Sequence, residues 1–389
     1  MPRNRLKRNL LSAICILCAS AMQANTLQAD TAAVDSVATK PGFISRVINY
    51  FSEANKSYPT EHIDFSFLGG PHYSSDSKFG IGLLAAGLYS TNPEDTLLQP
   101  SNVSLFADLT TAAHFKVGIR GEHIAPHDLY RLDYEIDFES IETKFWGIGY
   151  SQCSNDDNES KFRYLASSAN VKLTRQIVNN IYVGPMLTFN YINARRVNNP
   201  VLWEGLDRRT FNWGIGATFR YDTRDNSTEP EKGVLAEIAQ TFDGRWMGNR
   251  HGFSVNEITA AWYGKLWRGA VLATRLHSRV TWGDTPWGMM SYIGGSYNMR
   301  GYFEGRYRDK SEIDMCVELR QHVWRRNGIV VWGGAATIFP RFKDINLHQI
   351  LPNWGVGYRW EFKQRMNVRV DLGFGKGQCG FIFNINEAF

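Results

Sequence analysis

The stretch MCVELRQHV, at residues 315–323, alternates apolar and polar side chains. Successive side chains of a strand point to opposite faces of a sheet, so a period of two predicts a strand with two unlike faces. The apolar face carries Met315, Val317, Leu319 and Val323, and the other face carries Cys316, Glu318, Arg320 and His322. Because the alternation recurs at residues 131–138, 356–363 and 367–374, the pattern predicts an all-β protein.

Two classes of protein show this alternation. In a soluble sandwich the polar face meets water, whereas in a membrane barrel the apolar face meets lipid and the polar face meets a wet lumen. Strands of about ten residues suit a tilted bilayer crossing. The chain also ends in the alternating segment GFIFNINEAF, at residues 380–389, and the closing Phe389 resembles the insertion signal of bacterial outer-membrane barrels. These features favour the membrane barrel.

Counting back from the C terminus predicts about sixteen antiparallel strands, from residues 78–89 to residues 380–389, with both termini on the periplasmic side. Residues 128–139 and 143–151 are counted as separate strands. Short links are expected in the periplasm, at residues 140–142, 178–180, 267–269, 324–327 and 364–366. Mostly longer links are expected outside, at residues 90–101, 122–127, 152–160, 194–210, 243–251, 282–310 and 340–352. The alternating segment 62–73 either extends the first strand or lines the lumen.

The N-terminal residues are expected to direct export rather than to form part of the fold. Arg3, Arg5, Lys7 and Arg8 precede an apolar stretch that is followed by small residues, which is typical of a secretory signal peptide at residues 1–24. Residues 25–60 are expected to form a periplasmic extension with one short helix, and residues 61–389 the barrel. The predicted location is therefore the bacterial outer membrane, integral, after Sec-type export.

Composition narrows the classes of function. The formal net charge of +5 is mild, so nucleic acid is not an expected partner. Beyond the predicted signal peptide the chain keeps Cys153, Cys316 and Cys379, and an odd number argues against a disulfide framework. The sequence suggests no cofactor, no metal site and no catalytic residue, so we expect a protein that is not an enzyme.

Four motifs resemble the bacterial surface antigen superfamily, the outer-membrane assembly and translocation barrels of BamA and TamA type. MRGY, at residues 299–302 in the long loop 282–310, resembles the Arg-Gly-aromatic tip of that family's sixth external loop. The other matches, which occur in the family's order, are YDTRDNSTEPEKG at 221–233, GVGYRW at 355–360 and NVRVDLGFG at 367–375.

The resemblance implies that loop 282–310 folds into the lumen. Arg300 would contact acidic groups of the inner wall, with Glu318 and Asp371 as candidate partners, while Gly301 and Tyr302 complete the loop motif. The family commonly carries an Asp in the strand matching residues 330–339, where this chain has Gly333 or Gly334.

The periplasmic turn motif supplies three further candidates, Asp222, Arg224 and Asp225. Two interpretations remain open for them. Their charges pair across the turn and fix its shape, each exposed pair contributing about 0–1 kcal/mol, or they form a docking surface for periplasmic partners.

The function implied by the resemblance is assistance in inserting or transporting proteins or lipids at the outer membrane, by a short member without client-binding (POTRA) domains. The partners implied are the lipid bilayer, the machinery that inserts the barrel itself, nascent outer-membrane proteins or lipids, and a periplasmic partner. The alternatives are a passive pore or structural barrel, and an outer-membrane hydrolase. The hydrolase rests on His123, His127 and Asp128 in one predicted outer loop.

Overall fold

The computed structural model describes residues 63–74, 78–95, 98–111, 114–363 and 365–389. The chain divides into two units, Met1–Tyr50 and Phe51–Phe389, and the described residues all belong to the second. The predicted signal peptide, the periplasmic extension and its helix lie outside the described residues.

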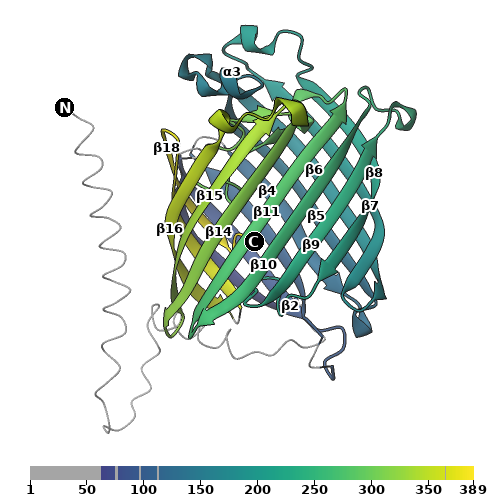
Figure 1. Ribbon diagram of the computed structural model, residues 1–389, viewed down its shortest axis with the longest axis vertical. Coiled ribbons are helices and arrows are strands. Elements are labelled where there is room, and N and C mark those ends of the chain that lie inside the picture. Colours follow the sequence, from purple (N-terminus) through teal and green to yellow (C-terminus); the bar gives the residue numbers. More distant parts are fainter. Residues whose placement is uncertain (1–62, 75–77, 96–97, 112–113, 364) are drawn as a thin grey trace, which may run out of the picture. The chain divides into compact units, whose positions relative to one another are not determined.

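The described residues form one antiparallel sheet of 16 strands in chain order, apart from one short added ribbon. Figure 1 shows the sheet curved into a barrel, which confirms the predicted all-β barrel fold. The strands of the sheet are β1 (Asp64–Ser74), β2 (Lys78–Tyr89), β3 (Ser101–Thr110), β4 (Phe115–Ile124), β5 (Tyr130–Phe145), β6 (Ser160–Val178), β7 (Ile181–Arg195), β8 (Arg209–Asp222), β9 (Gly233–Asp243), β10 (Phe253–Trp267), β11 (Ala270–Gly283), β14 (Ser311–Trp324), β15 (Asn327–Phe339), β16 (Leu351–Lys363), β17 (Met366–Gly375) and β18 (Gln378–Ile385).

Little regular structure lies outside this sheet. The ribbon pairs β12 (Ser291–Tyr292) with β13 (Arg308–Asp309), and the helix α3 spans Tyr150–Ser154. Single 3-10 turns lie at Pro126–Asp128, Asp156–Asn158, Pro200–Trp203, Arg245–Met247, Trp287–Met289, Phe342–Asp344 and Leu347–Gln349. Among the described residues no helix has both the length and the apolar character needed to cross a membrane.

Two strand assignments made from the sequence were wrong, and they compensate in the count. Segment 62–73 contains most of β1, which pairs with β2 along its whole length. The two strands expected at 128–139 and 143–151 are one: residues 130–145 form the single strand β5, which pairs with β6 from Tyr130 to Phe145, and the residues after Phe145 lie outside it. The expected turn at 140–142 does not form because its residues, Ser-Ile-Glu, continue the strand alternation and include no Gly, Pro or Asn.

The merged strand moves two links to the other end of the barrel. The links at 90–100 and 125–129 join strands at the same end as the turns at 179–180 and 223–232, since neighbouring strands alternate in direction. The expectation that residues 90–101 and 122–127 lie outside was therefore wrong, whereas the links that follow β5 keep their expected sides.

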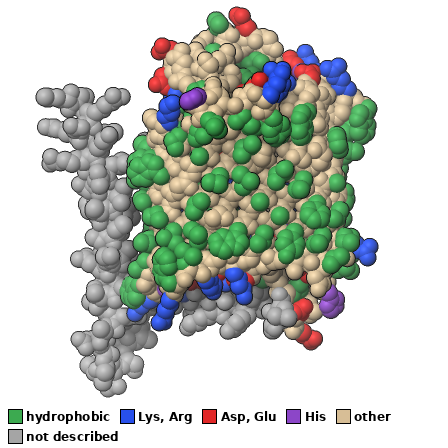
Figure 2. All heavy atoms as spheres, viewed as in Figure 1, with side chains coloured by type: hydrophobic (Ala, Val, Ile, Leu, Met, Phe, Trp, Pro, Cys, Tyr) green, Lys and Arg blue, Asp and Glu red, His purple; other side chains and the backbone are tan. Residues whose placement is uncertain are grey.

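The two faces of the wall differ as the alternation predicts. On β14 the outward Met315 is 51% exposed, whereas the inward Glu318 is 0% exposed. Figure 2 shows apolar side chains spread over the wall, with charged side chains gathered towards its two ends. An apolar outer band around a polar lumen is the arrangement that a barrel in a bilayer requires.

The sheet has one weak junction, between its first and last strands. β1 and β18 approach each other, but no backbone ladder joins them among the described residues, whereas every other pair of sheet neighbours is paired. β18 has only 8 residues, against 16 in β5. Unpaired strand edges leave N–H and C=O groups open to another strand, so we call this junction the seam.

A charge placed on the outer face tests the bilayer assignment. Val317 is 37% exposed on the outer face near the middle of β14. We expect Val317→Arg to lower the free energy of unfolding by about 2–4 kcal/mol, because a cation at mid-bilayer loses its hydration. Urea unfolding in lipid vesicles measures this, with Val317→Leu as the control. Equal urea midpoints for the Arg and Leu variants would contradict a lipid-facing Val317.

Candidate functional site

The tip of the loop between β11 and β14 packs directly on the backbone of β17. Gly301 has φ +109°, and a Cβ on it would lie 2.6 Å from the Phe374 backbone nitrogen. On β17, a Cβ on Gly373 would lie 2.6 Å from the Arg300 carbonyl oxygen, and one on Gly375 would lie 2.6 Å from the Tyr302 ring. Both sides of the contact therefore depend on glycine.

Arg300 reaches from this tip into a site that three strands build. It is 1% exposed, and its Nη1 lies 2.7 Å from Asp371 Oδ2 of β17. Its Nη2 contacts Glu318 of β14. The structure thus brings together Arg300 and both candidate partners named from the sequence. The guanidinium carbon lies 3.8 Å from the ring centroid of Trp332 on β15, so an indole stands beside the glycines where the family commonly has an acid.

These three residues belong to a larger closed circuit, which we call the charged ring. In order around the circuit, its members are Arg300, Glu318, Arg320, Glu387, Arg359 and Asp371. The closest N–O distances are 2.7 Å for Glu318–Arg320, 3.7 Å for Arg320–Glu387, 2.8 Å for Glu387–Arg359, 2.6 Å for Arg359–Asp371 and 2.7 Å for Asp371–Arg300.

Burial makes the balance of the ring important. The six side chains are at most 9% exposed, and the three guanidinium groups of the circuit balance its three carboxylates. A fourth buried guanidinium, that of Arg369, lies 3.7 Å from Asp371 outside the circuit. Removing one partner from a buried ion pair typically costs about 3–5 kcal/mol, because the charge left behind has lost both its water and its partner. Each ring member therefore depends on the others.

Glu387 brings the C-terminal tail, residues 386–389, into the ring. β18 ends at Ile385, and Asn386 with φ 63° redirects the chain. The Phe389 oxygen accepts a hydrogen bond of 2.7 Å from Arg320 Nη2, and its ring lies 5.4 Å from the Arg320 guanidinium carbon. Phe389 therefore contacts the lumenal ring and lies beyond the end of the last strand. Its role as an insertion signal stays a prediction.

The loop tip also holds the hairpin of β17 and β18 next to the seam. The Tyr302 hydroxyl donates to the Pro352 carbonyl at 2.7 Å and accepts from the Lys376 backbone N–H at 2.9 Å. Burial raises the pKa of Tyr302 to about 12. The Phe303 backbone N–H donates to Gln378 Oε1 of β18 at 2.9 Å. The tip therefore contacts the turn and the final strand of this hairpin.

At the other end of the lumen, the turn 223–232 contacts strands far from its own in the sheet. Asp222 and Arg224 pair with each other at 2.8 Å. Asp225 pairs at 2.8 Å with Arg365, which lies between β16 and β17. Burial opposes ionisation of Asp225, but the hydrogen bonds from Arg365 and from the backbone N–H groups of Glu231 and Lys232 together outweigh it, and the pKa of Asp225 is lowered. Since β8–β9 and β16–β17 are far apart in the strand order, the turn crosses the barrel mouth, and its charges hold that position.

The residues proposed for a hydrolase lie at this same end, not at the outer rim. His123 Nδ1 lies 2.7 Å from the Tyr89 hydroxyl. His127 lies in the link 125–129. Asp128 accepts two hydrogen bonds of 2.7 Å from Arg131 and a further one from Tyr182. The carboxylate of Asp128 is thus held by Arg131 and Tyr182, and no hydrogen bond joins it to His123 or His127 among the described residues.

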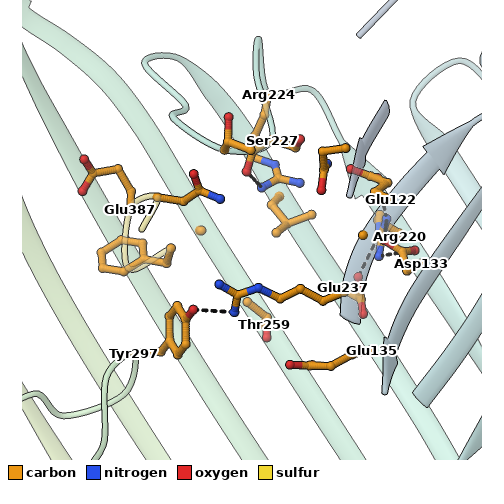
Figure 3. Close-up of a pocket in the computed structure, with 18 of the residues that line it drawn as sticks. Glu122, Asp133, Glu135, Arg220, Arg224, Ser227, Glu237, Thr259, Tyr297 and Glu387 are labelled. Atoms are coloured by element: carbon orange, nitrogen blue, oxygen red, sulfur yellow. Dashed lines mark hydrogen bonds and ion pairs between the residues drawn. The ribbon is translucent and has the colours of Figure 1, made fainter. Parts of the chain in front are cut away.

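Figure 3 shows the lumenal cavity beside the ring, with Arg220 at one side among Glu122, Asp133 and Glu237, and Glu387 across the space. Its volume is about 470 Å³. Arg220 Nε lies 2.7 Å from Glu237 Oε2, and its Nη2 lies 3.0 Å from Asp133 Oδ2. The wall opposite the ring is therefore also held by buried ion pairs.

Sequence reasoning missed half of the ring, the members Arg320, Glu387 and Arg359. Arg320 and Arg359 stand on the polar faces of strands that the alternation identified, the same inward faces that carry Glu318 and Asp371. That shared face was the available signal. Nothing in the pattern of the last strand indicated that its tail would turn into the lumen.

Replacing Arg300 tests the ring. We expect Arg300→Ala to lower the free energy of unfolding by about 3–5 kcal/mol, because Glu318 and Asp371 would stay buried with one cation fewer. The control is Arg245→Ala, since Arg245 is 68% exposed in its pair with Asp284, and we expect a change within about 0.5 kcal/mol. Heat-induced change in gel mobility follows unfolding. If both variants melt like the wild type, Arg300 does not hold the lumen.

Glu229, in the turn 223–232, should make the tail contacts depend on pH. Asn367 Nδ2 lies 2.7 Å from Glu229 and 2.9 Å from Glu387. Burial raises the pKa of Glu229 to about 7, above its ordinary value of 4.5. The folded state therefore binds the proton more tightly than the unfolded state does. The resulting stability is present below pH 4.5 and is lost as the pH rises to about 7.

The pH dependence of unfolding measures this effect. We expect the free energy of unfolding to fall by up to about 3 kcal/mol between pH 4.5 and pH 7.5 through Glu229. Glu229→Gln should remove that part of the slope, while Glu204→Gln, which changes an exposed glutamate, should keep it. Identical slopes for the wild type and Glu229→Gln would show that Glu229 titrates normally.

Comparison with known proteins agrees with this architecture. Residues 107–342 match the model of the Omp85 superfamily domain. BamA from Haemophilus ducreyi lacking POTRA domains 1-3 superposes with a TM-score of 0.52 and 12% identity, covering 88% of this chain and 78% of that one. CdiB from Escherichia coli superposes with a TM-score of 0.54 and 9% identity, covering 88% of this chain and 69% of that one. CdiB from Acinetobacter baumannii superposes with a TM-score of 0.50 and 13% identity, covering 92% of this chain and 69% of that one.

A search of the curated proteins gave no match. At these identities the solved structures establish a shared fold. The family model covers more than half of the chain, and the chain therefore belongs to the Omp85 superfamily of outer-membrane barrels.

Proposed function

We propose that this barrel assists the insertion or transport of proteins or lipids at the outer membrane by opening sideways at the seam. The observation that carries the proposal is the position of the loop tip. Tyr302 and Phe303 hold the hairpin of β17 and β18, and that hairpin forms one side of the only unpaired junction among the described strands.

The chemistry of the seam suits a client that adds a strand. The open edges of β1 and β18 offer backbone N–H and C=O groups that lipid cannot satisfy. An extended client segment can pair with such an edge, and main-chain hydrogen bonds then supply affinity without demanding one sequence. A nascent outer-membrane strand has this property, so we favour proteins as clients over lipids.

The charged ring would restrain how far the seam opens. Arg359 and Asp371 stand on β16 and β17, and Glu387 follows β18, so the ring ties the last three strands to Glu318 and Arg320 of β14. We propose that the ring keeps the hairpin in place while the unpaired edge of β18 receives a client.

Family membership and the shared fold with BamA and CdiB support a role in assembly or translocation. Residues 1–24 would direct export to the periplasm before insertion. A separate periplasmic partner would capture clients and deliver them to the end where the turn 223–232 lies. That turn is held across the mouth by Arg365, so it presents a fixed surface to such a partner.

Depletion of the protein in its bacterial host tests the proposal. Quantitative proteomics of the outer membrane, with analysis of outer-leaflet lipids, should show selective loss of some barrels or of surface lipids. A copy of the wild-type gene and the Arg245→Ala variant should restore them, whereas Arg300→Ala should not. An unchanged envelope after depletion would overturn the proposal. Steady single-channel conductance that Arg300→Ala leaves unaltered would instead favour a passive pore.

A further inference from the structure

On the lumenal face of β10, β11 and β14, one histidine lies among three carboxylates. His277 Nδ1 lies 3.1 Å from Asp314 Oδ2 and 3.2 Å from Glu312 Oε1, and His277 Nε2 lies 3.1 Å from Glu257 Oε1 of β10. His277, Glu312 and Asp314 are buried, with 7%, 1% and 0% of their surfaces exposed. The two ring nitrogens of His277 can donate to only two carboxylates, so the donors are too few for the three acceptors.

A second histidine in the same chain shows what a matched arrangement looks like. His251 Nε2 lies 2.7 Å from Asp207, and His251 Nδ1 lies 3.0 Å from Asp284. An imidazolium has one N–H on each ring nitrogen, so each carboxylate at His251 receives one hydrogen. At His277 three carboxylates face two ring nitrogens, and two of the three face Nδ1. A proton on Nδ1 can be donated well to only one of them.

The neighbouring cations do not remove this mismatch. Arg275 Nη2 lies 2.7 Å from Asp314 Oδ1, which leaves Oδ2 facing the histidine. Arg279, the other nearby cation, donates from Nη1 to the Met289 carbonyl oxygen at 2.8 Å. Glu312 Oε2 is buried and has no hydrogen-bond partner among the described residues. A buried carboxylate oxygen without a partner costs about 1–3 kcal/mol or more, so the site has an unfilled acceptor beside a crowded ring nitrogen.

We propose that His277, Glu312 and Asp314 bind one divalent transition-metal ion of the Zn²⁺ class. Their candidate ligand atoms lie within 4.8 Å of one another. Metal–ligand bonds of about 2.0–2.2 Å place neighbouring ligands roughly 3.0–3.5 Å apart, and the two distances at Nδ1 fall in that range. A neutral imidazole with two carboxylates is a ligand set that suits zinc and related ions, which imidazole selects over magnesium and calcium.

Glu257 would act as the outer partner of this site. A metal-bound histidine usually donates its other ring N–H to a carboxylate, which fixes the tautomer and turns the free lone pair toward the ion. Glu257 stands where it would accept the Nε2 hydrogen and leave Nδ1 unprotonated. Its side chain is 49% exposed, so the Nε2 side of the histidine faces the open lumen.

The metal would stiffen the wall beneath the docked loop. Arg275 links the site to the loop, because its Nη1 lies 2.7 Å from Asn298 Oδ1. Glu318 of the charged ring lies four residues after Asp314 on the same face of β14. Binding to the folded state alone stabilises a protein by mass action, so Zn²⁺ should raise the melting temperature of the barrel without any client present. The inference does not depend on the proposed function.

The experiment uses the full-length barrel in detergent, stripped with a chelator and titrated with Zn²⁺ alone. We expect one tightly bound ion per chain by calorimetry and elemental analysis, and a higher melting temperature. His277→Gln and the isosteric Glu312→Gln should abolish both effects. Glu257→Gln should weaken binding by about ten- to a hundredfold. His251→Gln is the matched control and should bind like the wild type.

Three results would overturn the metal site. If the wild type takes up no ion, or if His251→Gln loses as much Zn²⁺ as His277→Gln, the site is not a metal site. If His277→Gln does not fold, Glu312→Gln carries the test, because it keeps the shape of the side chain and changes only its charge. Zn²⁺ uptake that survives Glu312→Gln unaltered would also overturn the proposal.

Discussion

The charged ring is the constraint from which the rest of the lumen follows. Three guanidinium groups and three carboxylates are shut away from water, and loss of any single member leaves the other five with a net charge. Two members, Arg300 and Glu387, come from the loop tip and the C-terminal tail rather than from the wall. Neither segment can leave without depriving charges of the wall of their partners, so electrostatics fixes two segments that backbone pairing within the sheet does not.

The buried contacts of the lumen lie close to the one unpaired junction of the described sheet. The seam lies where β1 and β18 meet without a ladder, and the loop tip, the tail and the turn 223–232 all contact strands close to β18. Glycine makes the closest contact possible, since Gly301 and Gly373 leave no room for a side chain. Bracing there suits a wall that must hold its position while an edge is exposed.

Alternation predicted the class of fold and the inward positions of Glu318 and Asp371, because sheet geometry fixes which side chains face the lumen. The family motif singled out Arg300. Strand boundaries were less certain, since Ser140 and Glu142 can stand in a turn or continue a strand. Arg320, Arg359 and Glu387 were missed because their importance depends on pairing across strands, and the path of the tail after Ile385 depends on tertiary contacts. The turn with Asp222, Arg224 and Asp225 was found, but its partner Arg365 lies more than a hundred residues away in the chain.

A double-mutant cycle between Arg300 and Glu387 is the most direct measurement of the ring as one unit. The two side chains do not touch but are joined through Glu318–Arg320 and through Asp371–Arg359. Arg300→Met removes one positive charge and Glu387→Gln one negative charge, so the double variant restores neutrality. We predict that it loses less stability than the two single variants together, with a coupling of at least about 0.5 kcal/mol. Additive losses would contradict a ring that couples the loop tip to the C-terminal tail.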